Sequence, residues 1–282
     1  MLSFYKKPII VLLLFASFVG KVNANNLLQT YEDSLAHYFT LLSTEKSDQK
    51  KVEYNNEILR IFRAAIKIEE SFDYSFDSLA FVGVIYSPDN KVKIINWNLP
   101  YSSRTHKYFG FIQYKKSNRN ILTYELIDNS AKIKNPEMEI LNNENWYGAL
   151  YYKIIANKHS GKTYYTLLGA DLNNLLSKKK LIEILYFDRN NKPVFGKTVF
   201  KNRNKPVSRI IFEFNAQSNM VLTYDEEKEM IVYDHLSPSR PSLVGQFEFY
   251  GPDFSYDGLK FERGIWNSYP DIDVRNYSIN GF

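Results

Sequence analysis

The stretch that decides the fold is Ala80-Phe81-Val82-Gly83-Val84-Ile85-Tyr86, followed by Ser87-Pro88-Asp89-Asn90 and by Val92–Trp97. Two short runs of aromatic and β-branched residues flank a turn whose proline presets the first corner, and this arrangement predicts a β-hairpin. The same texture of short apolar runs and polar turns continues at fairly even spacing along the chain. We therefore expect residues 71–282 to form one large antiparallel β-meander.

Many further strands are predicted by this texture. They are expected at Tyr108–Tyr114, Ile121–Ile127, Tyr147–Ile155, Thr163–Leu168, Leu181–Phe187, Val194–Phe200, Arg209–Phe214, Met220–Tyr224, Met230–Tyr233, Leu243–Tyr250 and Leu259–Trp266. A second hairpin is expected around Asp188-Arg189-Asn190-Asn191. The strands group into three units of two hairpins, at 79–127, 147–200 and 208–266. A propeller-like arrangement, a sandwich and an irregular barrel all fit that grouping.

Two amphipathic helices are predicted before the meander, over residues 25–70. Apolar residues recur at three- and four-residue spacing in both helices: Leu28, Tyr31, Leu35, Tyr38 and Leu42 in the first, and Val52, Ile58, Leu59, Phe62, Ala65 and Ile66 in the second. The polar segment Ser43–Gln49 separates them, with Ser47 or Asp48 placed to cap the second helix. The fold class is thus mainly β, with an N-terminal helix pair.

Residues 1–24 have the three parts of a secretory signal peptide. Lys6 and Lys7 form a charged start, an uncharged run extends from Pro8 to Gly20, and Val22-Asn23-Ala24 matches a small-x-small cleavage site. The run is shorter than the ~20 residues of a transmembrane helix, although an uncleaved anchor is the alternative. We expect a periplasmic or secreted protein with no membrane span once the signal is removed.

The composition limits which interactions can stabilise the fold of such a protein. Cysteine is absent, so there is no disulfide, thiol nucleophile or lipidation site. Aromatic residues make up 16% of the chain and supply apolar surface to bury instead. The formal net charge of +5 falls to +2 when Lys6, Lys7 and Lys21 leave with the signal. A chain so close to neutral does not indicate a nucleic-acid partner.

The familiar catalytic strings are missing, among them the nucleophile elbow, the Walker loop and the H-E-x-x-H zinc motif. The best local candidate for a site is Asp253-Phe254-Ser255-Tyr256-Asp257-Gly258. Oxygen-bearing side chains at Asp253, Ser255 and Asp257, closed by a glycine, match the start of a Ca²⁺ loop. The bidentate Glu expected at the twelfth position is replaced by Gly264. A tight polar turn is the alternative interpretation.

Other residues that could carry chemistry have structural explanations. Asp234 and His235 are adjacent, but neighbours on a strand point to opposite faces, so their side chains should not meet. Trp97, Trp146 and Trp266 could stack on sugar rings but are predicted to be core. Lys178-Lys179-Lys180 is interpreted as a solvated strand edge that discourages unwanted pairing, with a phosphate or anionic polymer as the alternative contact.

Six segments of the chain, taken together, are similar to those of a known group of proteins. They are Tyr164-Tyr165-Thr166-Leu167-Leu168-Gly169, Ser177-Lys178-Lys179-Lys180, Asp188–Gly196, Tyr224-Asp225-Glu226-Glu227-Lys228, Tyr233-Asp234-His235-Leu236-Ser237-Pro238 and Phe249–Gly258. Together they resemble a group of uncharacterised exported proteins of Gram-negative bacteria. The resemblance implies an exported location and a shared β-rich fold, and it implies no activity.

Two functions remain open on the sequence. The first is a non-catalytic binding or structural protein of the bacterial envelope, whose partner is an envelope polymer or protein. The alternative is a metal-assisted or carboxylate-based hydrolase acting on glycan or another envelope polymer. Its motivation is the acidic section with Asp253, Asp257 and Asp234-His235.

Overall fold

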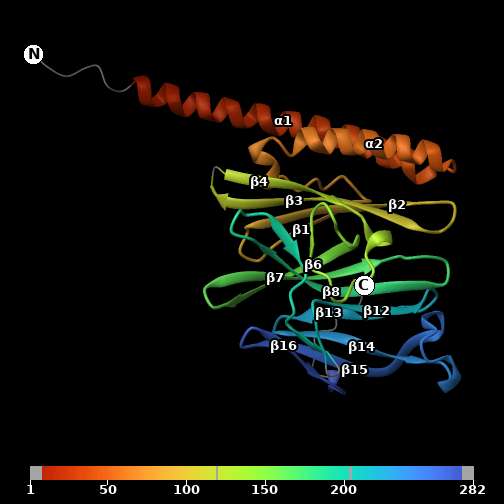
Figure 1. Ribbon diagram of the computed structural model, residues 1–282. Helices are drawn as coiled ribbons and strands as arrows, with labels where there is room; N and C mark the ends of the chain where they lie inside the picture. The colour runs from red at the N-terminus through yellow and green to blue at the C-terminus, as the bar shows by residue number, and fades with distance from the viewer. Residues whose placement is uncertain (1–7, 119, 203–204, 275–282) are drawn as a thin grey trace, which may run out of the picture. The chain divides into compact units, whose positions relative to one another are not determined.

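The computed structural model describes residues 8–118, 120–202 and 205–274 and is mainly β (Figure 1). Two helices come first, α1 (Pro8–Thr44) and α2 (Asp48–Ala65), followed by a 3₁₀ turn, η1 (Glu69–Phe72). The β-sheets follow. The predicted fold class, a helix pair before antiparallel sheets, is confirmed.

The Cα positions divide the chain into two compact units. One consists of Met1–Val82 and Lys115–Thr123, and the other of Gly83–Tyr114 and Tyr124–Phe282. The helices lie in the first unit. The apolar cores between the sheets, and the sites discussed below, lie in the second.

The helices bury the stripes that their spacing predicts. Leu28 and Leu35 are fully buried in α1, and Phe62 is fully buried in α2, whereas Val52 is 38% exposed. The side chain of Ser47 caps α2 by accepting a hydrogen bond from the backbone N–H of Lys50. Helix α1 begins at Pro8 and runs through the predicted cleavage position.

The charged start of the predicted signal, Lys6 and Lys7, lies outside the described residues. None of the helices that the structure describes is both long enough and apolar enough to span a membrane. The signal peptide of residues 1–24 therefore stays a prediction.

The strands form three sheets (Figure 1). The first has the order β1-β2-β3-β4, with β1 (Gly83–Tyr86), β2 (Val92–Pro100), β3 (His106–Ser117) and β4 (Asn120–Ile127). The middle sheet has the order β5-β9-β8-β7-β6, with β5 (Leu141–Asn142), β6 (Leu150–His159), β7 (Lys162–Asp171), β8 (Ser177–Phe187) and β9 (Pro193–Phe195), and β12 (Arg209–Asn215) also pairs with β8.

The third sheet has the order β11-β10-β16-β15-β14-β13. Its strands are β10 (Phe200–Asn202), β11 (Lys205–Val207), β13 (Leu222–Asp225), β14 (Met230–Pro238), β15 (Tyr250–Glu262) and β16 (Ile265–Tyr269). Strands β10 and β16 pair in parallel, in contrast to the antiparallel pairing of β14 with β15.

The middle sheet is buried on both faces. Leu167 and Leu181 belong to the core shared with the first sheet, while Leu168 and Ile182 belong to the core shared with the third. Because successive side chains of a strand point to opposite faces, a strand buried on both sides is a continuous apolar run. Among the described strands no sheet closes into a barrel, which is consistent with a sandwich or an irregular arrangement of sheets.

The three hairpin units predicted from the sequence correspond only in part to the three sheets. The first unit is the first sheet, and the other two exchange strands. Strand β10 begins at the end of the second unit and β11 lies between the second and third units, yet both belong to the third sheet. Strand β12, which falls in the third unit, pairs with β8 of the middle sheet. The spacing of hairpins along the sequence predicts which consecutive strands pair. It does not predict which sheet each strand joins.

Three predicted strands are wrong, and one of them, Val194–Phe200, is divided between β9 of the middle sheet and β10 of the third sheet. Leu243–Tyr250 consists mainly of 3₁₀ turns, η3 (Pro241–Leu243) and η4 (Phe247–Phe249), because Pro241 starts a helical turn and Gly245 adopts a φ of +87°. The predicted strand Leu259–Trp266 is instead a hairpin. Gly264, with a φ of +85°, allows the chain to reverse between β15 and β16.

The tryptophans confirm their predicted structural role. Trp97, Trp146 and Trp266 each have no exposed surface. None of them can present a ring to a sugar without a change of structure.

Candidate functional site

The predicted Ca²⁺ loop lies inside strand β15. Asp234 of β14 pairs with Tyr256, and Leu236 pairs with Pro252, so β15 carries extra residues in a bulge opposite β14. Asp253 accepts hydrogen bonds from the N–H and the Oγ of Ser255, at 3.1 and 2.7 Å. Both the tight-turn interpretation and the Ca²⁺-loop interpretation placed this segment outside a strand, and that placement is wrong.

Asp257 has partners different from those of Asp253. Its Oδ2 lies 2.8 Å from Nδ1 of His235, and its Oδ1 accepts the N–H of Asp271 at 3.1 Å. The described residues contain no group of three or more His, Cys, Asp or Glu side chains arranged to hold a metal ion. A Ca²⁺ site at Asp253, Ser255 and Asp257 stays a prediction that these contacts do not support.

Asp234 and His235 do not meet, as strand alternation predicts. Asp234 accepts the backbone N–H of Val221 at 2.6 Å, whereas His235 faces Asp257. Burial raises the pKa of the Asp234 carboxyl above its usual range. The histidine–aspartate pair that does form, His235 with Asp257, joins β14 to β15 and could not be read from adjacent positions.

The three consecutive lysines are not at a sheet edge, so that prediction is wrong. Strand β8 pairs with β7 on one side and with β12 on the other, and Lys178, Lys179 and Lys180 are opposite β12 residues Phe214, Glu213 and Phe212. Lys179 and Lys180 have partner residues on both neighbouring strands, whereas Lys178 pairs with β12 alone, and all three side chains are half-buried. Each amine can therefore reach water as well as partners within the sheet.

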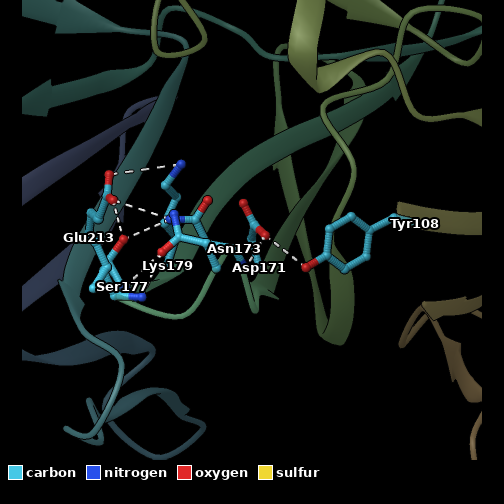
Figure 2. Close-up of polar contacts among 8 residues, drawn as sticks. Tyr108, Asp171, Asn173, Ser177, Lys179 and Glu213 are labelled. Atoms are coloured by element: carbon cyan, nitrogen blue, oxygen red, sulfur yellow. Dashed lines mark hydrogen bonds and ion pairs between the residues drawn. The ribbon is translucent and has the colours of Figure 1, made fainter. Parts of the chain in front are cut away.

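A polar network surrounds Lys179 at the turn between β7 and β8 (Figure 2). Glu213 of β12 lies 3.8 Å from the Lys179 amine and accepts hydrogen bonds from the side chains of Ser177 and Asn173. Asp171 accepts the hydroxyl of Tyr108 and the N–H of Asn173, each at 2.7 Å. The network is satisfied from within, so its role is to brace the turn.

Asp171 titrates abnormally within this network. Burial raises the pKa of its carboxyl, against the lowering effect of the hydrogen bonds from Tyr108 and Asn173. Burial also raises the pKa of the Tyr108 hydroxyl, as does the nearby Asp171 charge, so this phenol is a hydrogen-bond donor at neutral pH.

Replacing Asp171 by Asn should reduce the dependence of stability on pH. A raised folded-state pKa means that the folded protein binds more protons than the unfolded chain between the two pKa values, so the free energy of unfolding falls as pH rises through that interval. Asn keeps an acceptor oxygen without titrating. In urea unfolding from about pH 4 to about pH 7, the free energy of unfolding of D171N should therefore rise relative to that of the wild type as pH rises. A constant difference between the two would contradict the assigned shift.

The opposite end of the β7–β8 hairpin carries a cleft of about 570 Å³, which we call the aromatic–cationic cleft. Its lining residues are Tyr114, Tyr164, Tyr165, Tyr186 and Phe187, the cationic Lys91, Lys162, Arg189 and Lys197, and also Thr163 and Asp188. Residues from β3, β7 and β8 meet here with those of three connecting segments: the β1–β2 turn, the β8–β9 turn and the segment between β9 and β10. This is the candidate functional site.

The acid of the cleft already has partners. Asp188 Oδ1 accepts the N–H groups of Asn190 and Lys192, each at 2.8 Å, which closes the turn between β8 and β9. The predicted hairpin at Asp188–Asn191 is confirmed, with Asn191 at a φ of +63°. The remaining charges that line the cleft are all positive.

The rings of the cleft are held by one another. Tyr114 and Phe187 stack with ring centroids 3.8 Å apart, and Tyr164 meets Tyr186 edge-on at 5.9 Å. The Lys197 amine lies 5.0 Å from the centroid of the Tyr164 ring, a cation–π distance. The cleft thus presents positive charge directly beside aromatic faces.

Comparison of the chain with models of protein families, with curated proteins and with solved structures finds no match. The resemblance to exported Gram-negative proteins consequently stays a prediction, and the cleft itself carries the functional argument.

The sequence did not reveal this cleft, because its residues extend from Lys91 to Lys197. One local signal was present: Lys162-Thr163-Tyr164-Tyr165 combines a cation with two tyrosines at the start of a strand. Only the pairing of β7 with β8 brings Tyr164 to Tyr186.

Proposed function

We propose that this chain is a non-catalytic binding protein of the bacterial envelope whose aromatic–cationic cleft holds an acidic polysaccharide. The observation that carries the proposal is the pairing of Lys197 with the Tyr164 ring among other cations and rings of one cleft. The envelope location rests on the predicted signal of residues 1–24, and a purified envelope form whose chain begins at Asn25 would support it.

The chemistry of the cleft fits sugar acids. A tyrosine ring offers a flat apolar face to the C–H groups of a sugar and a hydroxyl that can hydrogen-bond. Arg189 offers a fork of donors that matches a carboxylate, and the lysines add positive charge. Burial raises the pKa of the Tyr186 hydroxyl, so this group stays protonated and can donate.

The proposal is tested by calorimetric titration with alginate oligosaccharides, which carry one carboxylate per sugar. We expect binding that weakens with added salt, because the contacts of the charged groups are screened. K197Q and Y164L should each weaken binding about tenfold, as loss of a desolvated cation–π and ring contact implies. K201Q is the matched control, since Lys201 is an exposed lysine of β10 that does not line the cleft.

Three results would overturn the proposal: unchanged affinity in K197Q and Y164L, equal affinity for neutral dextran, or tighter binding of a thymidine oligonucleotide. The last would indicate single-stranded nucleic acid, which also uses cations beside aromatic rings.

A hydrolase is the second candidate, and one observation favours it. His235, oriented by Asp257, lines an open cleft of about 580 Å³ with Tyr233, Phe247 and Tyr250. A carboxylate on Nδ1 leaves Nε2 to act as a base. If incubation with alginate releases reducing ends and H235Q abolishes this release, the non-catalytic proposal fails.

A further inference from the structure

A second cavity, of about 330 Å³, lies at the end of the β7–β8 hairpin that carries the polar network. Its lining residues are Ala170, Asp171, Leu172, Lys178, Lys179, Lys180, Phe214, Ser218, Asn219, Met220 and Val221. We call it the lysine cavity. It lies between the middle sheet and the segment that leads into β13, and its volume is at the small end of ligand sites, ~300–1,000 Å³.

Strand alternation divides the three lysines between two faces. Lys179 lies on the face of Glu213, its cross-strand partner, with which it pairs. Lys178 and Lys180 share the other face, opposite Phe214 and Phe212. That face also carries Phe214 and Met220 in the core between the middle and third sheets.

Lys180 is accommodated by its surroundings. Its amine lies 5.5 Å from the centroid of the Tyr152 ring, and the charge of Asp234 acts on it. Burial lowers the pKa of Lys180 to about 8, against the raising effect of Asp234. The Asp234 carboxylate, in turn, accepts the backbone N–H of Val221, a residue that lines the cavity.

Lys178 differs from its two neighbours. Among the described residues it makes no ion pair, and it is half-buried beside Phe214 of β12. Asp171, the acid that lines the cavity, is held by Tyr108 and Asn173 in the polar network. A cation without a counter-charge beside an apolar wall is the arrangement that an amphipathic anion would satisfy.

We propose that the lysine cavity binds a small anionic amphiphile, with its carboxylate or phosphate at Lys178 and Lys180 and its short apolar chain against Phe214, Met220 and Val221. This ligand is distinct from the acidic polysaccharide, and the site is at the opposite end of the hairpin, so the two proposals stand or fall separately.

Calorimetric titration with octyl phosphate and with octanoate tests the proposal, and the tighter ligand identifies the preferred head group. K178Q should weaken binding of that ligand about tenfold, the loss expected for a charge-assisted hydrogen bond. K178R should retain binding, because it keeps the positive charge. K201Q, on an exposed strand position outside the cavity, should leave the affinity unchanged.

Two further ligands separate the head group from the chain. Octyl glucoside has the same chain with a neutral head, and inorganic phosphate has the charge without a chain; each should bind at least tenfold more weakly than octyl phosphate. Equal binding of octyl glucoside, equal binding of inorganic phosphate, or unchanged affinity in K178Q with circular dichroism like that of the wild type would each overturn the proposal.

Discussion

Replacing Arg209 by Met is expected to lower the free energy of unfolding by about 3–5 kcal/mol, because the substitution leaves a buried carboxylate without its counter-charge. The side chains of Arg209 and Glu183 have no exposed surface, and the Arg209 Nε donates to Glu183 at 2.6 Å. Glu183 also accepts the hydroxyl of Tyr151, which in turn accepts the indole N–H of Trp146 at 2.7 Å. One substitution therefore disturbs a continuous polar chain inside the middle sheet.

Urea unfolding of four proteins measures this effect: wild type, R209M, E183L and the double variant E183L/R209M. The double variant should be more stable than R209M alone, because it removes both charges. R60M is the matched control, since Arg60 pairs with Glu57 on an exposed face of α2, where solvent screening leaves an ion pair with little effect on stability. If R209M and R60M lower the free energy of unfolding by the same amount, the buried pair does not stabilise the fold as described.

Replacing Trp266 by Ala should cost about 3–5 kcal/mol, the usual loss for a buried tryptophan. Trp266 has no exposed surface and packs against Phe261, with ring centroids 5.4 Å apart. Its indole N–H donates to Thr166 of β7 at 3.1 Å, so one side chain from β16 reaches the middle sheet. The loss therefore includes both apolar burial and a link between two sheets.

Thermal and urea unfolding of W266A and Y269A give the comparison. Tyr269 lies on the same strand and is 39% exposed, so its replacement by Ala should have a much smaller effect. A similar loss in both variants would mean that β16 contributes through its backbone pairing and not through the buried ring.

Local patterns predicted the strands well and the sheets poorly. Proline and asparagine turns marked the hairpins at Ser87–Asn90 and Asp188–Asn191, and strands follow them as expected. The exchange of β10–β11 and β12 between sheets depends on packing across the cores, which no local pattern specifies. For the same reason, an interior strand with three lysines was interpreted as an edge.

The Ca²⁺ motif is ambiguous for a physical reason that lies in the motif itself. Oxygen-bearing side chains at alternate positions suit a metal loop, but a strand with period two produces the same spacing. Gly258 then suggested a turn. A Cβ at this position would lie 2.6 Å from the Met230 sulfur, so the glycine serves close packing against β14.

The candidate site could not be predicted, because its contacts join residues far apart in sequence. Lys197 meets Tyr164, and His235 meets Asp257, only after strands have paired. Composition did indicate the material, a high share of tyrosine, and it did not indicate which rings stay accessible. All three tryptophans are buried, whereas several tyrosines line the cleft.

The exchange of strands has a consequence for how the second unit comes apart. The chain leaves the middle sheet after β9, enters the third sheet with β10 and β11, and returns to the middle sheet with β12. Neither sheet is formed by one continuous segment of the chain. A chain cut within this crossover would therefore leave both sheets without one of their strands. Heat should melt the two sheets in a single cooperative step, and gene fragments that encode only one of them would yield no stable product.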